Sequence, residues 1–201
     1  MKTSNRTSGI WEGMLPPTAS RLERGRAGLV LATSLALGVA ILFLIFIWLV
    51  SGDLQWETAV AGTIFIALLA GIGALARAGQ TSAATWALVG LLTLVITADV
   101  VPFGAGSLAA AGYVIPITVA ACGLGLWAGL GIAAFGAGVA WLVAWAATAG
   151  WYQPLVAPEI SHLTFNAPAL TAIFGIVGLV VGLWTRYLST SLEQANDRDD
   201  S

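Results

Sequence analysis

Single copies of several reactive residues limit the chemistry that this chain can carry. The sequence has one cysteine, Cys122, one histidine, His162, and one lysine, Lys2. One cysteine cannot form an intrachain disulfide, and one cysteine with one histidine cannot make a metal cluster. Because the lysine is not in a Gly-Lys-Ser/Thr sequence, a Walker loop is excluded. We therefore expect no metal and no cofactor.

Charged residues are scarce throughout the chain. Only 9% of its residues are charged and 58% are hydrophobic, whereas ordinary soluble domains carry about 25% charged residues. Such a chain has too little polar surface to cover a soluble globule, so the lipid bilayer is its expected partner. The net charge of −2 and the small number of basic residues argue against nucleic-acid binding.

Long apolar runs make up most of the sequence. Crossing the hydrocarbon layer takes roughly 20 residues of helix. The predicted fold is therefore an all-α membrane protein, a bundle of six transmembrane helices within residues 27–187, after a segment of residues 1–26 and before a tail of residues 188–201. The six predicted helices are 27–50, 58–76, 82–101, 107–126, 128–150 and 167–187.

Local signals mark some of the predicted helix ends. Pro102 is expected to end the third helix, because the residue before a proline is pushed out of helical geometry. Asn166 is a candidate N-cap for the last helix, which would place Pro168 in the first turn, where its missing N–H costs nothing. His162 and Glu159 would then lie in a loop between the last two helices.

The basic residues all fall on one side of this arrangement, whereas the loops on the other side carry only acidic charge. Since basic residues near helix ends are retained in the cytoplasm, we expect both termini to be cytoplasmic. The basic residues are Lys2, Arg6, Arg21, Arg24, Arg26, Arg77, Arg186 and Arg198. The acidic residues of the opposite loops are Asp53, Glu57, Asp99 and Glu159.

Glycine pairs with G-x-x-x-G spacing occur at Gly125–Gly129 and Gly178–Gly182. Small residues at this spacing let helix backbones approach closely in lipid. Packing within the bundle is the favoured interpretation, and dimerisation through the last helix is the alternative.

Four residues are candidates for ligand binding. Pro116 is expected to kink the fourth helix and free the carbonyl of Gly112, and a kink near Tyr113 can line a cavity or serve packing alone. Asp99 can be either a solvated carboxylate at the membrane surface or part of a ligand site. His162 can sense external pH or be an ordinary loop residue.

An intramembrane serine protease of the rhomboid type is the one enzyme candidate. Ser107 lies at the start of the fourth predicted helix, but Ala105 stands where that family's G-x-S pattern needs glycine. Residues 167–187 contain no histidine, so the serine would lack a base within hydrogen-bonding reach. We expect no catalytic residues.

The C-terminal segment resembles part of a known signalling family. Leu188, Leu192 and Ala195 are spaced four and three residues apart, like the start of a coiled-coil seam. The Ser-Leu-Glu-Gln-Ala sequence of residues 191–195 and the Tyr-Val-Ile-Pro-Ile-Thr-Val-Ala-Ala sequence of residues 113–121 are similar to the polytopic membrane input domains of bacterial sensor histidine kinases.

This resemblance implies a function in two-component signal transduction at the bacterial inner membrane. A stimulus would pass through the last helix to a cytoplasmic kinase or another output domain, with Leu188, Leu192 and Ala195 as coupling residues in a homodimer. The 201 residues include no ATP-binding domain, so we expect no kinase activity from the chain itself. The alternative is a small transport or assembly subunit, such as the substrate-binding component of an uptake system.

Overall fold

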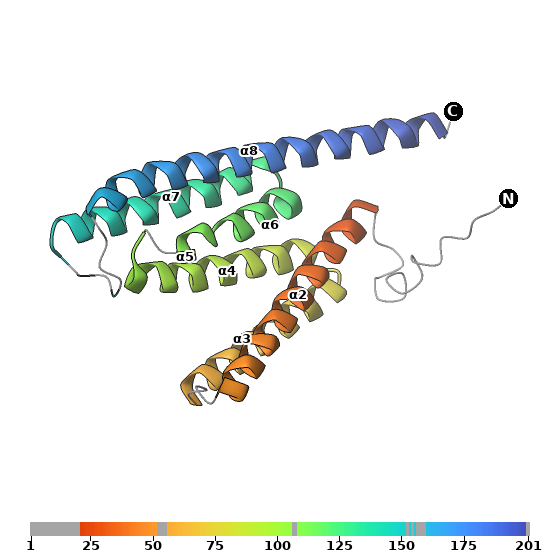
Figure 1. The fold of residues 1–201 in the computed structure, drawn as a ribbon. Coiled ribbons are helices and arrows are strands. Elements are labelled where there is room, and N and C mark those ends of the chain that lie inside the picture. Colours follow the sequence, from red (N-terminus) through yellow and green to blue (C-terminus); the bar gives the residue numbers. More distant parts are fainter. Residues whose placement is uncertain are drawn as a thin grey trace. The chain divides into compact units, whose positions relative to one another are not determined.

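The computed structural model is all helical over the residues it describes, which are 21–51, 56–105, 108–151, 153, 155 and 160–199. This confirms the predicted all-α class. The helices, labelled in Figure 1, are α2 (Arg21–Ser51), α3 (Trp56–Arg77), α4 (Thr81–Phe103), α5 (Leu108–Ala111), α6 (Val114–Leu124), α7 (Leu126–Thr148) and α8 (Ile160–Asp199).

Five segments of the described chain are long and apolar enough to cross a membrane, as in a multi-pass membrane protein. At 1.5 Å per residue, a helix of about 20 residues matches the hydrocarbon layer. These segments are Gly25–Ser51, Trp56–Arg77, Thr81–Phe103, Leu126–Thr148 and Ala167–Leu188.

The fourth predicted helix, residues 107–126, is wrong as a single element. The structure has the short helices α5 and α6 instead, separated by a turn at Gly112 and Tyr113. The N–H of Gly112 donates to Ala109 O (2.9 Å) and that of Tyr113 to Ala110 O (3.3 Å). These bonds reach back three residues rather than four, so the helix tightens at this turn, while Tyr113 keeps helical dihedral angles (φ −59°, ψ −20°).

Glycines, rather than the proline, end two of the long helices. Pro102 lies inside α4, which continues to Phe103, so the predicted end at residue 101 is wrong. Gly104 has φ +86° and donates its N–H to Val100 O (2.8 Å). Gly79, with φ +83°, follows α3 in the same way. A glycine accepts this left-handed conformation without a Cβ penalty.

Helix α8 begins earlier than predicted. It starts at Ile160 instead of residue 167, so Asn166 is not its N-cap and Pro168 lies inside the helix. Proline is tolerated inside membrane helices when neighbouring groups satisfy the freed backbone atoms. His162 consequently belongs to α8 and not to a loop.

The chain divides into two compact units, with the boundary between Leu88 and Val89 inside α4. In the N-terminal unit, α2 and α3 form an antiparallel pair joined by close contacts at two glycines. A methyl group added at Gly62 would lie 2.7 Å from Ile45 Cδ1, and one at Gly73 would lie 3.6 Å from Leu31 Cδ2. Small residues thus allow these two helices to approach closely.

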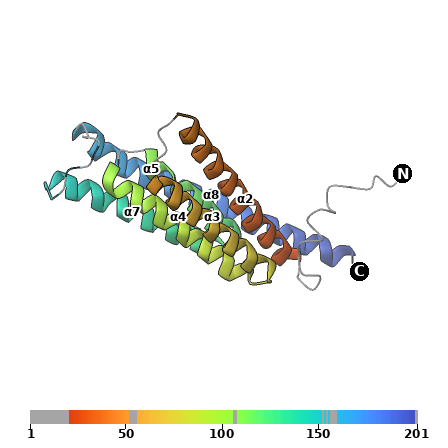
Figure 2. The ribbon, with the colours of Figure 1, turned by 90° about the horizontal axis from the view of Figure 1, so that it is seen from below.

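The C-terminal unit contains α5, α6, α7, α8 and the second half of α4. Within it, α7 and α8 lie side by side (Figure 1 and Figure 2). Its buried core is built mainly from small side chains, which lets the helices pack closely without a large aromatic interior. The core residues are Val100, Ala105, Ala110, Tyr113, Ile117, Ala133, Ala137, Ala140, Val143, Ala144, Ala167 and Phe174.

Candidate functional site

Tyr113 belongs to the buried core of the C-terminal unit. It lies in the turn between α5 and α6, and its side chain is fully buried. Its hydroxyl is 2.5 Å from Thr97 Oγ1 on α4. Thr97 Oγ1 already donates its only hydrogen to Thr93 O (2.7 Å). Tyr113 is therefore the donor of this bond, and Thr97 is the acceptor.

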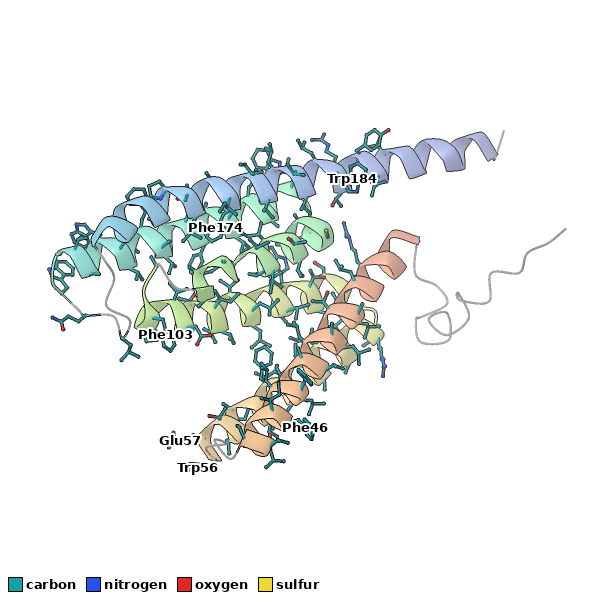
Figure 3. The ribbon with its side chains drawn as sticks, viewed as in Figure 1. Phe46, Trp56, Glu57, Phe103, Phe174 and Trp184 are labelled. Atoms are coloured by element: carbon teal, nitrogen blue, oxygen red, sulfur yellow. The ribbon has the colours of Figure 1, made fainter. Side chains whose placement is uncertain are left out.

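The ring of Tyr113 also contacts α7 and α8. It meets Phe174 of α8 edge to face, with ring centroids 5.7 Å apart and planes at 61°. This is a favourable geometry for two aromatic rings. A methyl group added at Gly136 of α7 would lie 3.0 Å from the Tyr113 ring. Tyr113 thus contacts α4, α7 and α8 through one side chain. Its aromatic partner Phe174 is labelled on α8 in Figure 3.

Pro116 does not act as the predicted kink. It is the third residue of α6 and is fully buried, so its missing N–H falls in the first helical turn, where no intrahelical partner is required. The carbonyl of Gly112 accepts a hydrogen bond from Ile115 N (3.0 Å). The prediction that this carbonyl is freed is wrong, while ligand binding by Tyr113 or Pro116 stays a prediction.

The structure does not bring the other two candidate ligand residues to Tyr113. Asp99 is on α4 and exposed, whereas its neighbours Thr97 and Val100 are the residues that enter the core. The side chain of His162 is outside the described residues, as are Glu159 and Ser107. A role for Asp99 or His162 in ligand binding stays a prediction.

The glycine pair of α8 packs inside the chain. A methyl group added at Gly182 would lie 2.9 Å from Leu126 Cα and also meet the Leu126 side chain. One at Gly178 would lie 3.6 Å from Gly129 O and 3.6 Å from Ile117 Cγ2. The predicted packing of this G-x-x-x-G pair within the bundle is confirmed. It meets the second predicted pair, because Gly129 faces it from α7.

Two polar contacts extend the packing of α8 on its neighbours. Near the start of the apolar span of α8, Trp141 Nε1 of α7 donates to Thr171 Oγ1 (3.1 Å). Near the end of that span, the Thr185 hydroxyl donates to Val181 O (2.8 Å) and also lies 3.8 Å from Cys122 Sγ of α6. α8 is therefore held against α6 and α7 from Thr171 to Thr185.

The predicted coupling residues lie beyond these contacts. Leu188 is the last residue of the apolar span of α8 and is 43% exposed. Leu192 and Ala195 are on the same helix, and their side chains are outside the described residues. Coupling through these residues stays a prediction.

Sequence reasoning missed Thr97, Gly136 and Phe174 as partners of Tyr113. Thr97 carried a usable signal, since a hydroxyl in an apolar run must find an acceptor or donor in lipid. Gly136 and Phe174 carried none, because glycine and phenylalanine are common in membrane helices and their partners are set by tertiary packing.

Comparison with known proteins gives no relative: no family model matches the chain, and no curated protein or solved structure is significantly similar to it.

Proposed function

We propose that this chain is a membrane-embedded input module, similar to those of bacterial sensor histidine kinases, which passes a stimulus through α8 to a cytoplasmic output domain or partner. The observation that carries the proposal is the length of α8. It is one helix of 40 residues, Ile160–Asp199, and its apolar span ends at Leu188. The prediction that this helix runs unbroken through Ala195 is confirmed.

The packing of α8 supports its role as the transmitting element. Phe174, Gly178 and Gly182 hold it against the core at close range. Close-packed interiors respond to a change in one place by moving whole elements rather than by deforming locally. Figure 1 shows that α8 continues well past α6 and α7. A displacement of α8 in the core would therefore reach the segment after Leu188.

We also propose six membrane crossings, with α5 and α6 together as the fourth and both termini on the cytoplasmic side of a bacterial inner membrane. The geometry of the C-terminal unit supports this count. The end of α4 lies beside residue 155, since Leu155 N donates to Pro102 O (2.9 Å). The α6–α7 turn lies near Gly182, toward the other end of the apolar span of α8, because a methyl group added at that glycine would meet Leu126. α5 and α6 thus lead from one end of the unit to the other.

Cysteine labelling in intact cells checks this topology. In a Cys122→Ala background, Gln153→Cys is expected to react with an impermeant thiol reagent from outside, while Gln80→Cys and Gln194→Cys are expected to react only after lysis. If α5 and α6 together did not cross, Gln153 and Gln194 would exchange sides while Gln80 stayed inside. That pattern would contradict the count of six crossings.

Interchain crosslinking in native membranes tests the proposed function. In the same background, single cysteines at Leu188, Leu192 and Ala195 are expected to form disulfides between two chains, because these positions make the seam of a parallel pair. Cysteines at Ser191 and Gln194 serve as controls and are expected to crosslink several-fold less. Equal crosslinking at all five positions, or none at any, would favour the monomeric transport or assembly subunit.

A further inference from the structure

The seam residues of α8 continue a pattern that starts deep inside the membrane span. From Ala167 to Ala195, one set of positions spaced alternately by four and three residues contains no charged residue and no proline. We call this set the α8 stripe. Its members are Ala167, Thr171, Phe174, Gly178, Val181, Thr185, Leu188, Leu192 and Ala195. Such a spacing keeps one face of a helix against a neighbouring helix over its whole length.

From Phe174 to Thr185, the α8 stripe packs against other helices of its own chain. Phe174 contacts the Tyr113 ring, Gly178 lies against Gly129 and Ile117, and Thr185 reaches Cys122. The stripe therefore follows the contact with α6 and α7 as far as the level of Cys122. At Leu188 the side chain is 43% exposed.

From these observations we infer that, in a dimer, the α8 stripe passes from the helices of its own chain to a second copy, whose α8 lies beside the Cys122 end of α6. This inference rests on the proposed function, because it requires the parallel pair of α8 helices. The occupant is a second copy because the four–three spacing continues past Leu188 as a seam that two identical helices can share.

The drift of a seven-residue repeat around a straight α-helix allows a second helix to meet the α8 stripe at Leu188. On a straight α-helix, positions with a seven-residue repeat drift by about 20° per heptad. Between Phe174 and Leu188 the stripe thus turns away from the centre of the face that packs on α6 and α7. A partner helix that meets the stripe at Leu188 then lies beside α6 rather than in its place. At an interaxial distance of about 8–10 Å, it contacts both α8 and the end of α6.

The native cysteine gives a direct test. Two tagged forms of the chain are co-expressed, one with Cys122 as its only cysteine and one with Cys122→Ala and Leu188→Cys. A bis-maleimide with a span of about 10 Å, matched to the distance between packed helices, is added to membranes. The expected result is a crosslink between the two forms. Thr190→Cys, on the opposite side of α8 from the stripe, replaces Leu188→Cys as the matched control and is expected to crosslink several-fold less.

Inserting one residue into α8 tests whether the contact with the partner's Cys122 depends on the direction in which the α8 stripe faces. One alanine between Tyr187 and Leu188 turns the following segment by about 100° relative to the bundle. We expect this insertion to abolish the crosslink between Cys122 of one chain and the cysteine that replaces Leu188 in the other. The same alanine placed after Asn196 is expected to leave that crosslink unchanged.

Different results would overturn the placement of the partner's α8 beside α6 and the parallel pair of α8 helices. If two Leu188→Cys chains crosslink to each other but Leu188→Cys and Thr190→Cys reach Cys122 of the partner equally or not at all, the inference is overturned and the parallel pair stands. Loss of the crosslink between two Leu188→Cys chains themselves would overturn the parallel pair and the inference with it.

Discussion

Gly182→Ala is expected to lower the free energy of unfolding by about 2–3 kcal/mol, near the upper end of the range for an overpacked site. The added methyl group would lie 2.9 Å from Leu126 Cα, which is backbone and cannot move aside by changing a rotamer. α8 would then have to separate from the start of α7. Unfolding of the purified protein by titration with a denaturing detergent measures the change.

Gly175→Ala is the matched control on the same helix. A methyl group added at Gly175 would meet no atom of a neighbouring helix within 4 Å. Because alanine favours the helix over glycine by up to about 1 kcal/mol, this variant is expected to be as stable as the native chain or slightly more stable. Equal losses of stability for Gly175→Ala and Gly182→Ala would contradict the close contact of α8 with Leu126.

Tyr113→Ala is expected to destabilise the C-terminal unit by about 3–5 kcal/mol, as for other large aromatic side chains removed from a core. The substitution leaves a cavity between α4, α7 and α8 and removes the contact with Phe174. It also removes the hydrogen bond to Thr97. Detergent-induced unfolding, followed by tryptophan fluorescence, is the appropriate measurement.

Tyr113→Phe separates the ring from the hydroxyl. It keeps the contacts with Gly136 and Phe174 and loses only the bond donated to Thr97, which costs about 0.5–1 kcal/mol in a membrane interior. Thr97 remains satisfied as a donor to Thr93 O. A Tyr113→Phe variant as unstable as Tyr113→Ala would mean that the hydroxyl, not the packed ring, holds the core together.

Apolar runs located the long helices well because lipid leaves no alternative to continuous backbone hydrogen bonding. They failed for residues 107–126, where the sequence signal pointed to a kink at Pro116 rather than to a turn at Gly112 and Tyr113. The turn at Gly112 and Tyr113 places a large ring between three helices, and that choice depends on Gly136 and Phe174, far away in sequence.

Local signals at helix ends were weaker than the surrounding packing. Asn166 and Pro168 suggested a helix start, yet α8 begins at Ile160. Pro102 suggested a helix end, yet α4 continues to Phe103. The site was predictable in part: Tyr113 stood out as a polar ring near a proline, whereas its partners are defined only by the fold.

If α8 transmits a stimulus, a change in the membrane core must reach the end of this helix. Spin labels at Leu192 in a Cys122→Ala background, measured between chains in lipid bilayers, test it most directly. Phe174→Ala, which alters the buried contact with Tyr113, is expected to shift or broaden the distance distribution. Ile176→Ala, on the same helix but 61% exposed, is expected to leave it unchanged. Identical distributions for the native chain and both variants, or no distance between chains at all, would contradict transmission through α8.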